Sequence, residues 1–383
     1  MRRKQKPLVN LVLFLTVLLA ILFLNRSHSS NKVFAWTTIR YKPSAASVPP
    51  TRGICPGLSS TKPALIVARV QADGDPGWLQ TLSDRYQLCV YTADAPEDST
   101  SMNLQVPANR GHEAMTYLTF IIDNYDTIPE AGAVFVHGSR FSWHNDSPDY
   151  DNLALLHSLN ISAALAPVGY HNLRCDWSAS TCDQASAPQG SLENSFRAVL
   201  QPYDPRVISD SALPRSLAIL FGGDVRDAAG TAEEVLLGRG DAVRSQCCAQ
   251  FVVARENIWR HTPEEYIALR QWLLEGTSHH DLEQRTRNKN AAPRDDRVAG
   301  RILSYLWHIL FIHQRGSQGQ DHGASKIDLQ QLNRLACPRA DECYCRLYGR
   351  CNLPGCSSPG RCAGQYQIPP DFKLPAHWAA SHP

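Results

Sequence analysis

The amino-acid sequence predicts an α/β fold in which a mixed or parallel sheet is flanked by helices. Two observations support this fold class. Apolar runs of strand length at residues 64–70, 88–92 and 133–137 alternate with a helical pattern that starts at residue 109, and such alternation is typical of a parallel or mixed sheet. The composition, with 43% hydrophobic and 19% charged residues, is that of a globular chain.

The first 24 residues predict a transmembrane signal anchor. Residues 8–24 carry no charge, and as a helix they would be about 26 Å long, close to the hydrocarbon thickness of a bilayer. Basic residues in the preceding tip, residues 1–7, predict a cytoplasmic N-terminus and a type II membrane protein of the ER or Golgi lumen. A signal peptide cleaved near Ser27 is the alternative. Sequons at Asn145 and Asn160 are expected glycosylation sites in that compartment.

Composition divides the remaining chain into three parts. Residues 25–54 are rich in Ser and Pro and predict a stem, residues 55–336 a lumenal α/β domain, and residues 337–383 a cysteine-rich C-terminal tail. The 12 cysteines suit an oxidising lumen, and disulfides are favoured over a zinc knuckle in the tail. Cys175 and Cys182 could close a small disulfide loop. The net charge of only +2 argues against a nucleic-acid partner.

Local patterns predict the individual elements. The run at residues 64–70 is apolar except for one arginine, which is typical of a strand buried on both faces. Asn109 is a plausible N-cap for the helix that follows it. Thr262 and Glu265 fit a capping box around a proline at the first helical position. The other expected elements are strands at residues 217–221 and 249–253, helices at residues 151–159, 263–275 and 298–313, and an exposed loop at residues 277–297.

The densest group of polar residues begins where the apolar run at residues 133–137 ends. Ligands of open α/β sheets bind outside the carboxyl ends of the strands. We therefore take His137, His144 and Asp146 as candidate catalytic residues, with a histidine as the base or a metal ligand. Arg140 is the candidate anion-binding residue of this segment. A surface loop packed on Trp143 is the alternative.

A second group of polar residues lies at the expected start of a helix. Asn109, Arg110 and Glu113 are candidate substrate-binding residues. The N-terminus of a helix offers backbone N–H groups to a phosphate, and Arg110 would add positive charge. Ordinary helix capping is the alternative interpretation.

A third group, in residues 169–177, combines aromatic and charged side chains. Asn172, Arg174, Asp176 and Trp177 are candidate substrate-binding residues of a sugar site. Aromatic faces suit the C–H surfaces of a sugar ring, and amides and carboxylates suit its hydroxyl groups. A structural loop held by a disulfide is the alternative.

The sequence leaves the cofactor unknown. Two Asp-x-Asp patterns, Asp73 with Asp75 and Asp149 with Asp151, could supply oxygen ligands to divalent Mn or Mg. A chain with this many aspartates contains such patterns by chance, and Asp149 and Asp151 also lie where helix-capping carboxylates belong. A metal ligand set is therefore not predicted.

Six segments together resemble a fungal family of uncharacterised single-pass membrane proteins, the domain-of-unknown-function 3431 family. The resemblance spans roughly residues 60–350 and implies no reaction, because the family has none established. The matching segments are NRGHEAMTYLTFIIDNYDTIPE, FVHGSRFSWH, GYHNLRCDW, CCAQFVVAREN, YLWHILF and CPRADECYC.

A looser resemblance links the chain to glycosyltransferases of the single Rossmann-like nucleotide-sugar fold. The shared features are the anchor, the stem, the early strand–helix–strand order, and the segment 249–258 followed by a capped helix. The resemblance implies a nucleotide-sugar donor and a glycan acceptor. In two places the chain departs from the pattern: His137 and Gly138 stand where an acidic metal pair is expected, and Ser304 stands where a carboxylate is expected.

The leading hypothesis is a membrane-anchored lumenal enzyme that transfers a sugar from a nucleotide donor to a glycan or lipid-linked acceptor. Arg110 and Arg140 would contact the diphosphate, while Asp146 and Asp176 would shape the sugar site. The alternative is a non-catalytic glycan- or protein-binding protein of the secretory pathway. A third hypothesis is a hydrolase with Glu113 and Asp146 as its carboxylate pair.

Overall fold

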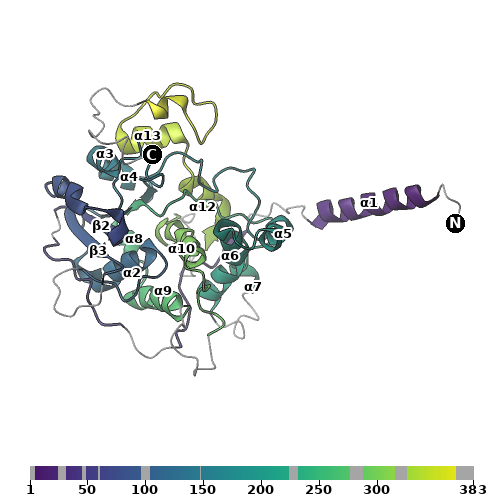
Figure 1. Cartoon of the computed structure of the whole chain (residues 1–383), viewed down its shortest axis with the longest axis horizontal. Coiled ribbons are helices and arrows are strands. Elements are labelled where there is room, and N and C mark those ends of the chain that lie inside the picture. Colours follow the sequence, from purple (N-terminus) through teal and green to yellow (C-terminus); the bar gives the residue numbers. More distant parts are fainter. Residues whose placement is uncertain are drawn as a thin grey trace, which may run out of the picture.

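The computed structural model shows an N-terminal helix, α1 (Gln5–Leu24), and an α/β domain (Figure 1). Predictions for residues 1–4, for residues 277–287 and for the chain after residue 367 lie outside the described residues. The structure describes residues 5–24, 32–44, 49–58, 61–95, 104–146, 148–223, 232–276, 288–314 and 326–367.

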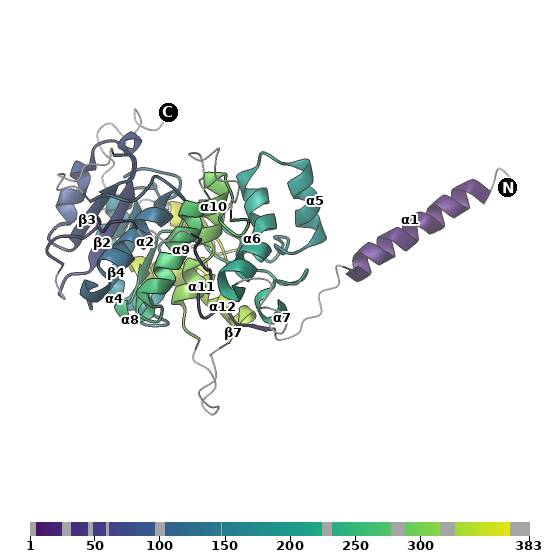
Figure 2. The same ribbon diagram turned by 90° about the horizontal axis from the view of Figure 1, so that it is seen from below.

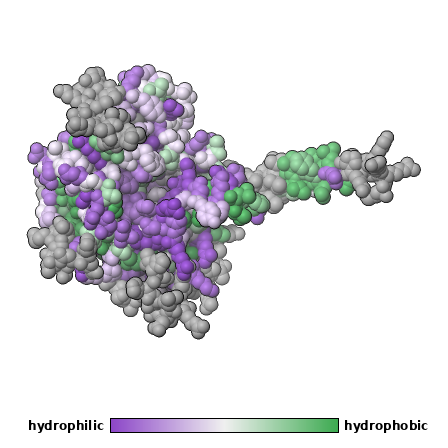
Figure 3. All heavy atoms as spheres, in the orientation of Figure 1, coloured by the Kyte–Doolittle hydropathy of each residue, from purple (hydrophilic) through white to green (hydrophobic). Residues whose placement is uncertain are grey.

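The helix expected near the N-terminus is present as α1. Its described side chains are those of residues 9–20, and all of them are exposed. In Figure 3 they form a mainly hydrophobic band that stands apart from a more hydrophilic domain. Among the described residues, no helix is both long enough and apolar enough to cross a membrane.

A five-stranded mixed sheet forms the centre of the domain, with the strand order β3-β2-β4-β6-β5. β2 (Ala64–Arg69) pairs in parallel with β3 (Gln87–Thr92) and with β4 (Ala133–His137). β6 (Phe251–Val253) runs antiparallel to β4 and to β5 (Tyr170–Asn172). The predicted strands at residues 64–70, 88–92, 133–137 and 249–253 are confirmed as β2, β3, β4 and β6. β5 lies in a segment predicted to be a loop.

Helices of two kinds, α-helices and 3-10 helices, surround this sheet. The capping box predicted for α9 is confirmed, with Thr262 and Glu265 bonded to each other's backbone N–H groups. The helices are α2 (Glu113–Asp123), α3 (Asn152–Ser158), α4 (Ile161–Leu165), α5 (Leu192–Leu200), α6 (Pro205–Gly222), α7 (Ala232–Val235), α8 (Arg255–Ile258), α9 (Pro263–Glu275), α10 (Asp296–Ser304), α11 (Trp307–Phe311), α12 (Leu329–Ala336) and α13 (Ala340–Tyr348). The 3-10 helices are η1 (Gln71–Asp73), η2 (Pro76–Leu82), η3 (Tyr125–Thr127) and η4 (Ala363–Tyr366).

Both faces of the sheet are covered. On β2, Ala64 and Ile66 belong to one apolar cluster, and Leu65 and Val67 belong to the other, because successive side chains of a strand point to opposite faces. Helices α2 and α9 contribute to the cluster of Ile66, and α3, α4 and α13 contribute to the cluster of Leu65 (Figures 1 and 2). This double burial explains why the strands are continuous apolar runs.

Three predicted elements differ from the structure. The strand predicted at residues 217–221 is wrong, because these residues lie in the helix α6, where most of their apolar side chains are buried. The helix predicted at residues 298–313 is divided into α10 and α11. The helix expected from Asn109 begins at Glu113, because His112 has a φ of 52°, outside the helical region.

The segment predicted as a stem enters the folded domain. β1 (Val33–Phe34) pairs antiparallel with β7 (Ile327–Asp328). Phe34 and Trp36 are fully buried, with their ring centroids 4.1 Å apart. These two aromatic residues, from the segment predicted as a stem, therefore belong to the apolar core.

Six disulfides connect the cysteines of the described residues, which confirms the expectation of disulfides. The predicted pairing of Cys175 with Cys182 is wrong. Cys175 pairs with Cys343 and Cys182 with Cys337, so both bonds fasten the C-terminal tail to the domain. The other pairs are Cys55–Cys89, Cys247–Cys248, Cys345–Cys351 and Cys356–Cys362.

Candidate functional site

A cavity of about 690 Å³ opens at the carboxyl ends of β2 and β4. Its wall includes Arg69 and Val70 at the end of β2, His137 at the end of β4, and Glu113 at the start of α2. β3 and β4 lie on opposite sides of β2, so the chain reverses its winding direction between β2 and β4. Ligands of open α/β sheets bind at such a switch point, which makes this cavity the candidate site.

Gly138 allows the ends of β2 and β4 to approach each other. A Cβ atom at this position would lie 2.8 Å from Arg69 Cα and 2.8 Å from Asp73 Oδ2, too close for a side chain. The neighbouring Ser139 hydroxyl donates to Asp73 Oδ1 at 2.5 Å. Arg69 Nη2 donates to the Gly74 carbonyl at 2.7 Å. These contacts hold the two strand ends together as one wall of the cavity.

Positive charge exceeds negative charge on the described wall of the cavity. Arg301 of α10 donates to the Tyr305 hydroxyl at 3.1 Å, and its Nη2 lies 3.9 Å from Asp210 Oδ1. Its buried Nε has no hydrogen-bond partner among the described residues. A guanidinium group with donors to spare is suited to bind phosphate oxygens. The arginines of the wall are Arg69, Arg206, Arg297 and Arg301, and its carboxylates are Asp73, Glu113 and Asp204.

His137, Trp143 and His144 form a row of rings along this wall. The ring centroids of His137 and His144 are 5.1 Å apart, and those of Trp143 and His144 are 3.9 Å apart. Burial, followed by the electrostatic influence of His137, Arg174 and His112, lowers the pKa of His144 to about 4. His144 is therefore neutral at neutral pH, mainly because it is buried.

A disulfide between the adjacent residues Cys247 and Cys248 lines the same cavity. The Cys248 carbonyl lies 2.7 Å from His137 Nε2. The pairing partner of a cysteine cannot be read from its spacing. The disulfide is thus a part of the site that sequence reasoning missed.

Four of the predicted site residues line the cavity, namely Asn109, Glu113, His137 and His144. Several lining residues were not predicted, and only Arg297 and Arg301, one helical turn apart, offered a sequence signal. The unpredicted basic residues of the wall are Arg69, His112, Arg206, Arg297 and Arg301, and the predicted residues that do not line the cavity are Arg110, Arg140, Asp146, Asn172, Arg174, Asp176 and Trp177.

Arg110 fastens two segments of the fold together. It is 3% exposed, and its Nη1 donates to Asp296 at 2.8 Å and to the Arg294 carbonyl at 3.0 Å. Its Nη2 donates to the Pro293 carbonyl. These bonds join the start of α2 to the segment before α10. The predicted contact with a diphosphate does not fit this position.

Arg140 and Asp146 are also held outside the cavity. Arg140 donates twice to Asp151, at 3.0 and 2.8 Å. Asp146 is 1% exposed and accepts hydrogen bonds from a backbone N–H and from the Tyr344 hydroxyl, the latter at 2.9 Å. Because Asp146 does not face the cavity that Glu113 lines, the structure does not bring together the carboxylate pair of the hydrolase hypothesis.

The four residues predicted for a sugar site form a buried network instead. Asn172 Oδ1 accepts the backbone N–H of Arg174 at 2.9 Å, and Arg174 Nη1 donates to two backbone carbonyls of residues 143 and 145. Asp176 accepts from Gln365 at 2.5 Å. Trp177 Nε1 donates to the carbonyl of residue 338 at 3.0 Å. The network therefore connects the domain to its C-terminal tail.

The two predicted glycosylation sites differ in exposure. Asn160 is exposed and caps α4, with its Oδ1 accepting the Ala163 N–H at 3.0 Å. Asn145 is fully buried, and its Nδ2 donates to the carbonyls of Arg140 and Tyr150. In the folded structure Asn160 is accessible and Asn145 is not.

The possible Mn or Mg ion has no ligand set in the described part of the chain. These residues contain no group of three or more His, Cys, Asp or Glu side chains that could hold a metal ion. Asp73 accepts hydrogen bonds from the Val70 N–H and from Ser139. Asp75 caps η2, and Asp151 caps α3. The Asp-x-Asp patterns thus serve local structure, and the charge of the site comes from arginine.

Comparison with known proteins identifies a family but not a reaction. Residues 65–346 match the model of a family described as protein of unknown function (DUF3431). No curated protein and no solved structure matches the chain. The matched residues contain nearly all of the central sheet and every residue of the cavity wall, and the match confirms the resemblance drawn from the six motifs.

Proposed function

The chain belongs to the DUF3431 family of proteins of unknown function, and we propose that its cavity is the active site of a glycosyltransferase-like enzyme that uses a nucleotide sugar. The observation that carries this proposal is the set of four arginines on the wall of a cavity at the switch point of the sheet. One guanidinium group can bind two phosphate oxygens at once. Crevices at the switch point of the sheet bind nucleotides in many α/β proteins.

The size of the cavity supports a ligand of this kind. Small-molecule sites enclose roughly 300–1,000 Å³, and the cavity has about 690 Å³. In the proposed complex, the diphosphate lies against Arg301 and Arg297 of α10. Arg297 pairs with Asp295 at 2.9 Å, but both side chains are exposed, so Arg297 can exchange this partner for phosphate oxygens, unlike Arg140, whose partner Asp151 is buried. The rings of His144 and Trp143 offer faces on which a sugar or base can stack.

In the proposed reaction, the bond between the anomeric carbon and the diphosphate oxygen breaks, and a bond between that carbon and an acceptor hydroxyl oxygen forms. The departing nucleoside diphosphate gains negative charge, which Arg297 and Arg301 stabilise more strongly in the transition state than in the ground state. The proton of the acceptor hydroxyl passes to a base on the wall. No step is assigned to a metal ion.

The proposal includes a membrane anchor at residues 8–24. These residues carry no charge, and the described side chains of α1 are exposed and mainly apolar. Exposed apolar surfaces of this kind mark contacts with membranes or proteins. The basic residues before the span favour a type II orientation with the domain in the ER or Golgi lumen. The six disulfides suit that oxidising compartment.

Turnover tests the proposal directly. The full chain, purified in detergent with its disulfides intact, is incubated with a panel of nucleotide sugars and glycan acceptors, and release of nucleoside diphosphate is measured. We expect release from one class of donor and its loss in the Arg297→Gln/Arg301→Gln variant. Arg339→Gln is the matched control, because Arg339 pairs with Asp341 on α13, outside the cavity wall.

Two other outcomes are informative. Binding of a nucleotide without turnover would favour the alternative of a non-catalytic binding protein of the secretory pathway. A ligand that binds the native state raises its stability. The proposal would therefore be contradicted by a chain that melts cooperatively but whose melting temperature is raised by no nucleotide.

A further inference from the structure

The Cys247–Cys248 disulfide gives one wall of the cavity an uncommon backbone. It joins neighbouring residues whose Cα atoms are 3.7 Å apart. Cys248 and Ala249 have φ values of 79° and 46°, a region that residues with a Cβ atom seldom adopt. Such conformations persist where the surrounding structure fixes them, and they cluster at functional sites.

This backbone decides the tautomer of His137. The Cys248 carbonyl lies 2.7 Å from His137 Nε2. A carbonyl oxygen only accepts hydrogen bonds, so Nε2 must carry the proton, and in the neutral imidazole Nδ1 is then the acceptor. The Cys247 carbonyl is also held, because it accepts a hydrogen bond from Asn172 Nδ2 at 3.3 Å. The backbone carbonyls of both cysteines are therefore hydrogen-bonded to side chains of neighbouring strands.

The other histidine of the row is a poorer base. His144 Nδ1 lies 2.9 Å from the Ser142 hydroxyl. Its pKa of about 4 also leaves it weakly basic. His137, at the end of β4, is thus the better placed of the two imidazoles to accept a proton from a molecule in the cavity.

We propose that the Cys247–Cys248 disulfide is a positioning element that holds His137 as the Nε2–H tautomer, with Nδ1 as the base for the acceptor hydroxyl. The identity of that hydroxyl rests on the proposed function. As the new carbon–oxygen bond forms, the O–H bond breaks and its proton moves to Nδ1. The electron pair of the broken anomeric bond leaves with the diphosphate. Without the disulfide, the Cys248 carbonyl is free to turn away from Nε2.

The tautomer can be measured without an activity assay. Nitrogen NMR of the full chain with isotope-labelled histidine distinguishes protonated from unprotonated ring nitrogens, and a His137→Gln variant assigns the signals. We expect the Nε2–H form in the wild type and a mixture of tautomers in Cys247→Ser/Cys248→Ser. The matched control, Cys345→Ser/Cys351→Ser, removes a short-range disulfide of the tail and should keep the wild-type signals.

An unchanged His137 tautomer in Cys247→Ser/Cys248→Ser would overturn the inference. If that variant does not melt cooperatively, limited reduction of the wild type, with the opened pair identified by mass spectrometry, gives the same comparison. In an active enzyme, the variant should lower kcat at least ten-fold and leave the donor KM unchanged. If the His137 tautomer changes in Cys247→Ser/Cys248→Ser but the chain binds no nucleotide, the proposed function is contradicted. The role of the disulfide in positioning His137 would still hold.

A second, independent observation concerns the outer side of α5. Phe196, Val199 and Leu200 recur at helical spacing in α5, and Tyr203 lies in the turn that follows the helix; these side chains are 67%, 76%, 78% and 92% exposed. We call these four residues the α5 surface. The buried residue of α5 is the polar Asn194. A helix with its apolar side outward is expected to meet another apolar surface.

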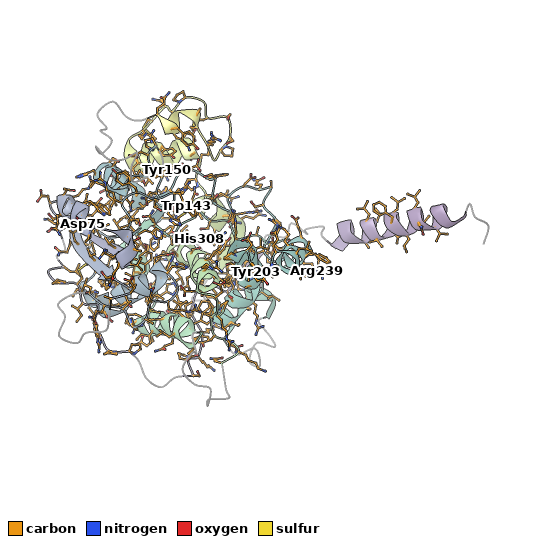
Figure 4. The ribbon with its side chains drawn as sticks, viewed as in Figure 1. Asp75, Trp143, Tyr150, Tyr203, Arg239 and His308 are labelled. Carbon is orange, nitrogen blue, oxygen red and sulfur yellow. A yellow bond between two sulfur atoms is a disulfide. The ribbon has the colours of Figure 1, made fainter. Side chains whose placement is uncertain are left out.

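The α5 surface lies on the side of the domain from which the chain leads to α1. Lys32, the first described residue after α1, donates to the Leu236 carbonyl at 3.2 Å. Figure 2 shows α5 as a part of the domain near α1, and Figure 4 shows Tyr203 and Arg239 on that side. Residues 25–31 separate α1 from Lys32 and can span at most about 29 Å.

We infer that the α5 surface rests on the lipid bilayer in which α1 is anchored. The inference depends on the proposed anchor, because the short connection keeps this side of the domain close to the membrane. Arg197 of α5 and Arg239 are exposed, and their guanidinium groups would meet lipid phosphates. Apolar side chains beside basic ones are typical of elements that lie in the membrane interface.

Photolabelling of the full chain tests this contact. The protein is reconstituted in phosphatidylcholine vesicles that contain a lipid with a photoactivatable acyl chain, and labelled peptides are identified by mass spectrometry. We expect labelling of residues 192–203 as well as α1, with at least a ten-fold decrease at α5 in Phe196→Ser/Leu200→Ser. Ile54→Ser is the matched control, because Ile54 is 61% exposed outside the α5 surface.

The possible outcomes separate the two claims. Labelling of α1 without labelling of residues 192–203 would overturn the inference and leave the anchor standing. Labelling of neither segment would contradict the anchor itself. Photo-crosslinks from residues 192–203 to a second copy of the chain in place of lipid would also overturn the inference.

Discussion

Arg140 and Asp151 form a two-point ion pair, in which Arg140 Nε and Nη2 lie 3.0 and 2.8 Å from the two carboxylate oxygens. Asp151 is almost fully buried and also caps α3 through the Leu153 N–H. Arg140 comes three residues after His137, which lines the cavity, but its guanidinium group is taken up by this carboxylate. Its role is therefore to satisfy a buried charge.

Arg140→Ala should destabilise the fold without removing nucleotide binding. The variant leaves the Asp151 carboxylate buried and unpaired, so we expect the free energy of unfolding to fall by about 2 kcal/mol. Denaturant unfolding measures this change, and calorimetric titration measures the affinity for a nucleoside diphosphate. A loss of affinity as large as that of Arg301→Gln would show that Arg140 contacts the ligand.

Gly138→Ala should damage the cavity itself. The added methyl group has no room between the ends of β2 and β4, so it must displace Arg69 and Asp73. We expect at least ten-fold weaker nucleotide binding and a lower thermal midpoint. Gly222→Ala serves as the control, because the nearest atom to its new Cβ would be the end of the Val235 side chain at 3.3 Å. Wild-type affinity in Gly138→Ala would contradict the role of this glycine.

His308 should make folding stability depend on pH. Burial lowers its pKa to about 3, so the folded chain keeps it neutral while the unfolded chain protonates it below about pH 6.5. The stabilising contribution is complete above about pH 6.5 and falls as the pH drops toward the folded pKa. His308→Leu should reduce the slope of unfolding free energy against pH by about one proton over that range. Parallel profiles of the two proteins would contradict this expectation.

Glycosylation should occur at Asn160 and not at Asn145. The full chain produced in cells with a secretory pathway should lose the mass of one glycan in Asn160→Gln. Asn145→Gln should leave the glycan mass unchanged but lower the thermal midpoint, because the Asn145 amide donates to two buried carbonyls. A chain without a glycan at Asn160 would count against the proposed lumenal location.

Local signals account for the parts of the fold that could be predicted from the sequence. β4 and α9 have the predicted bounds, because an apolar run and a capping box specify them within a few residues. The apolar run at residues 217–221 was ambiguous, because a short buried run fits a strand or a helix. Burial of its side chains within the long helix α6 decided the outcome.

The candidate site was less predictable, because distant segments build it. His137 and His144 were found from their position after a strand, but Arg297 and Arg301 reach the cavity from α10, far along the chain. Arg110 was predicted to bind an anion, because the sequence does not show that the distant backbone carbonyls of residues 293 and 294 accept its hydrogen bonds. The Cys247–Cys248 pairing was likewise invisible in the spacing of the cysteines.

The central claim is that the arginines of the cavity bind a diphosphate. Isothermal titration of the full chain with nucleoside diphosphates tests it most directly. We expect binding by the wild type and by Arg339→Gln, and at least ten-fold weaker binding, about 1.4 kcal/mol, by Arg297→Gln/Arg301→Gln. The affinity should also fall as salt is added. Equal affinity in the wild type and the double variant, or no binding by a folded wild type, would contradict the claim.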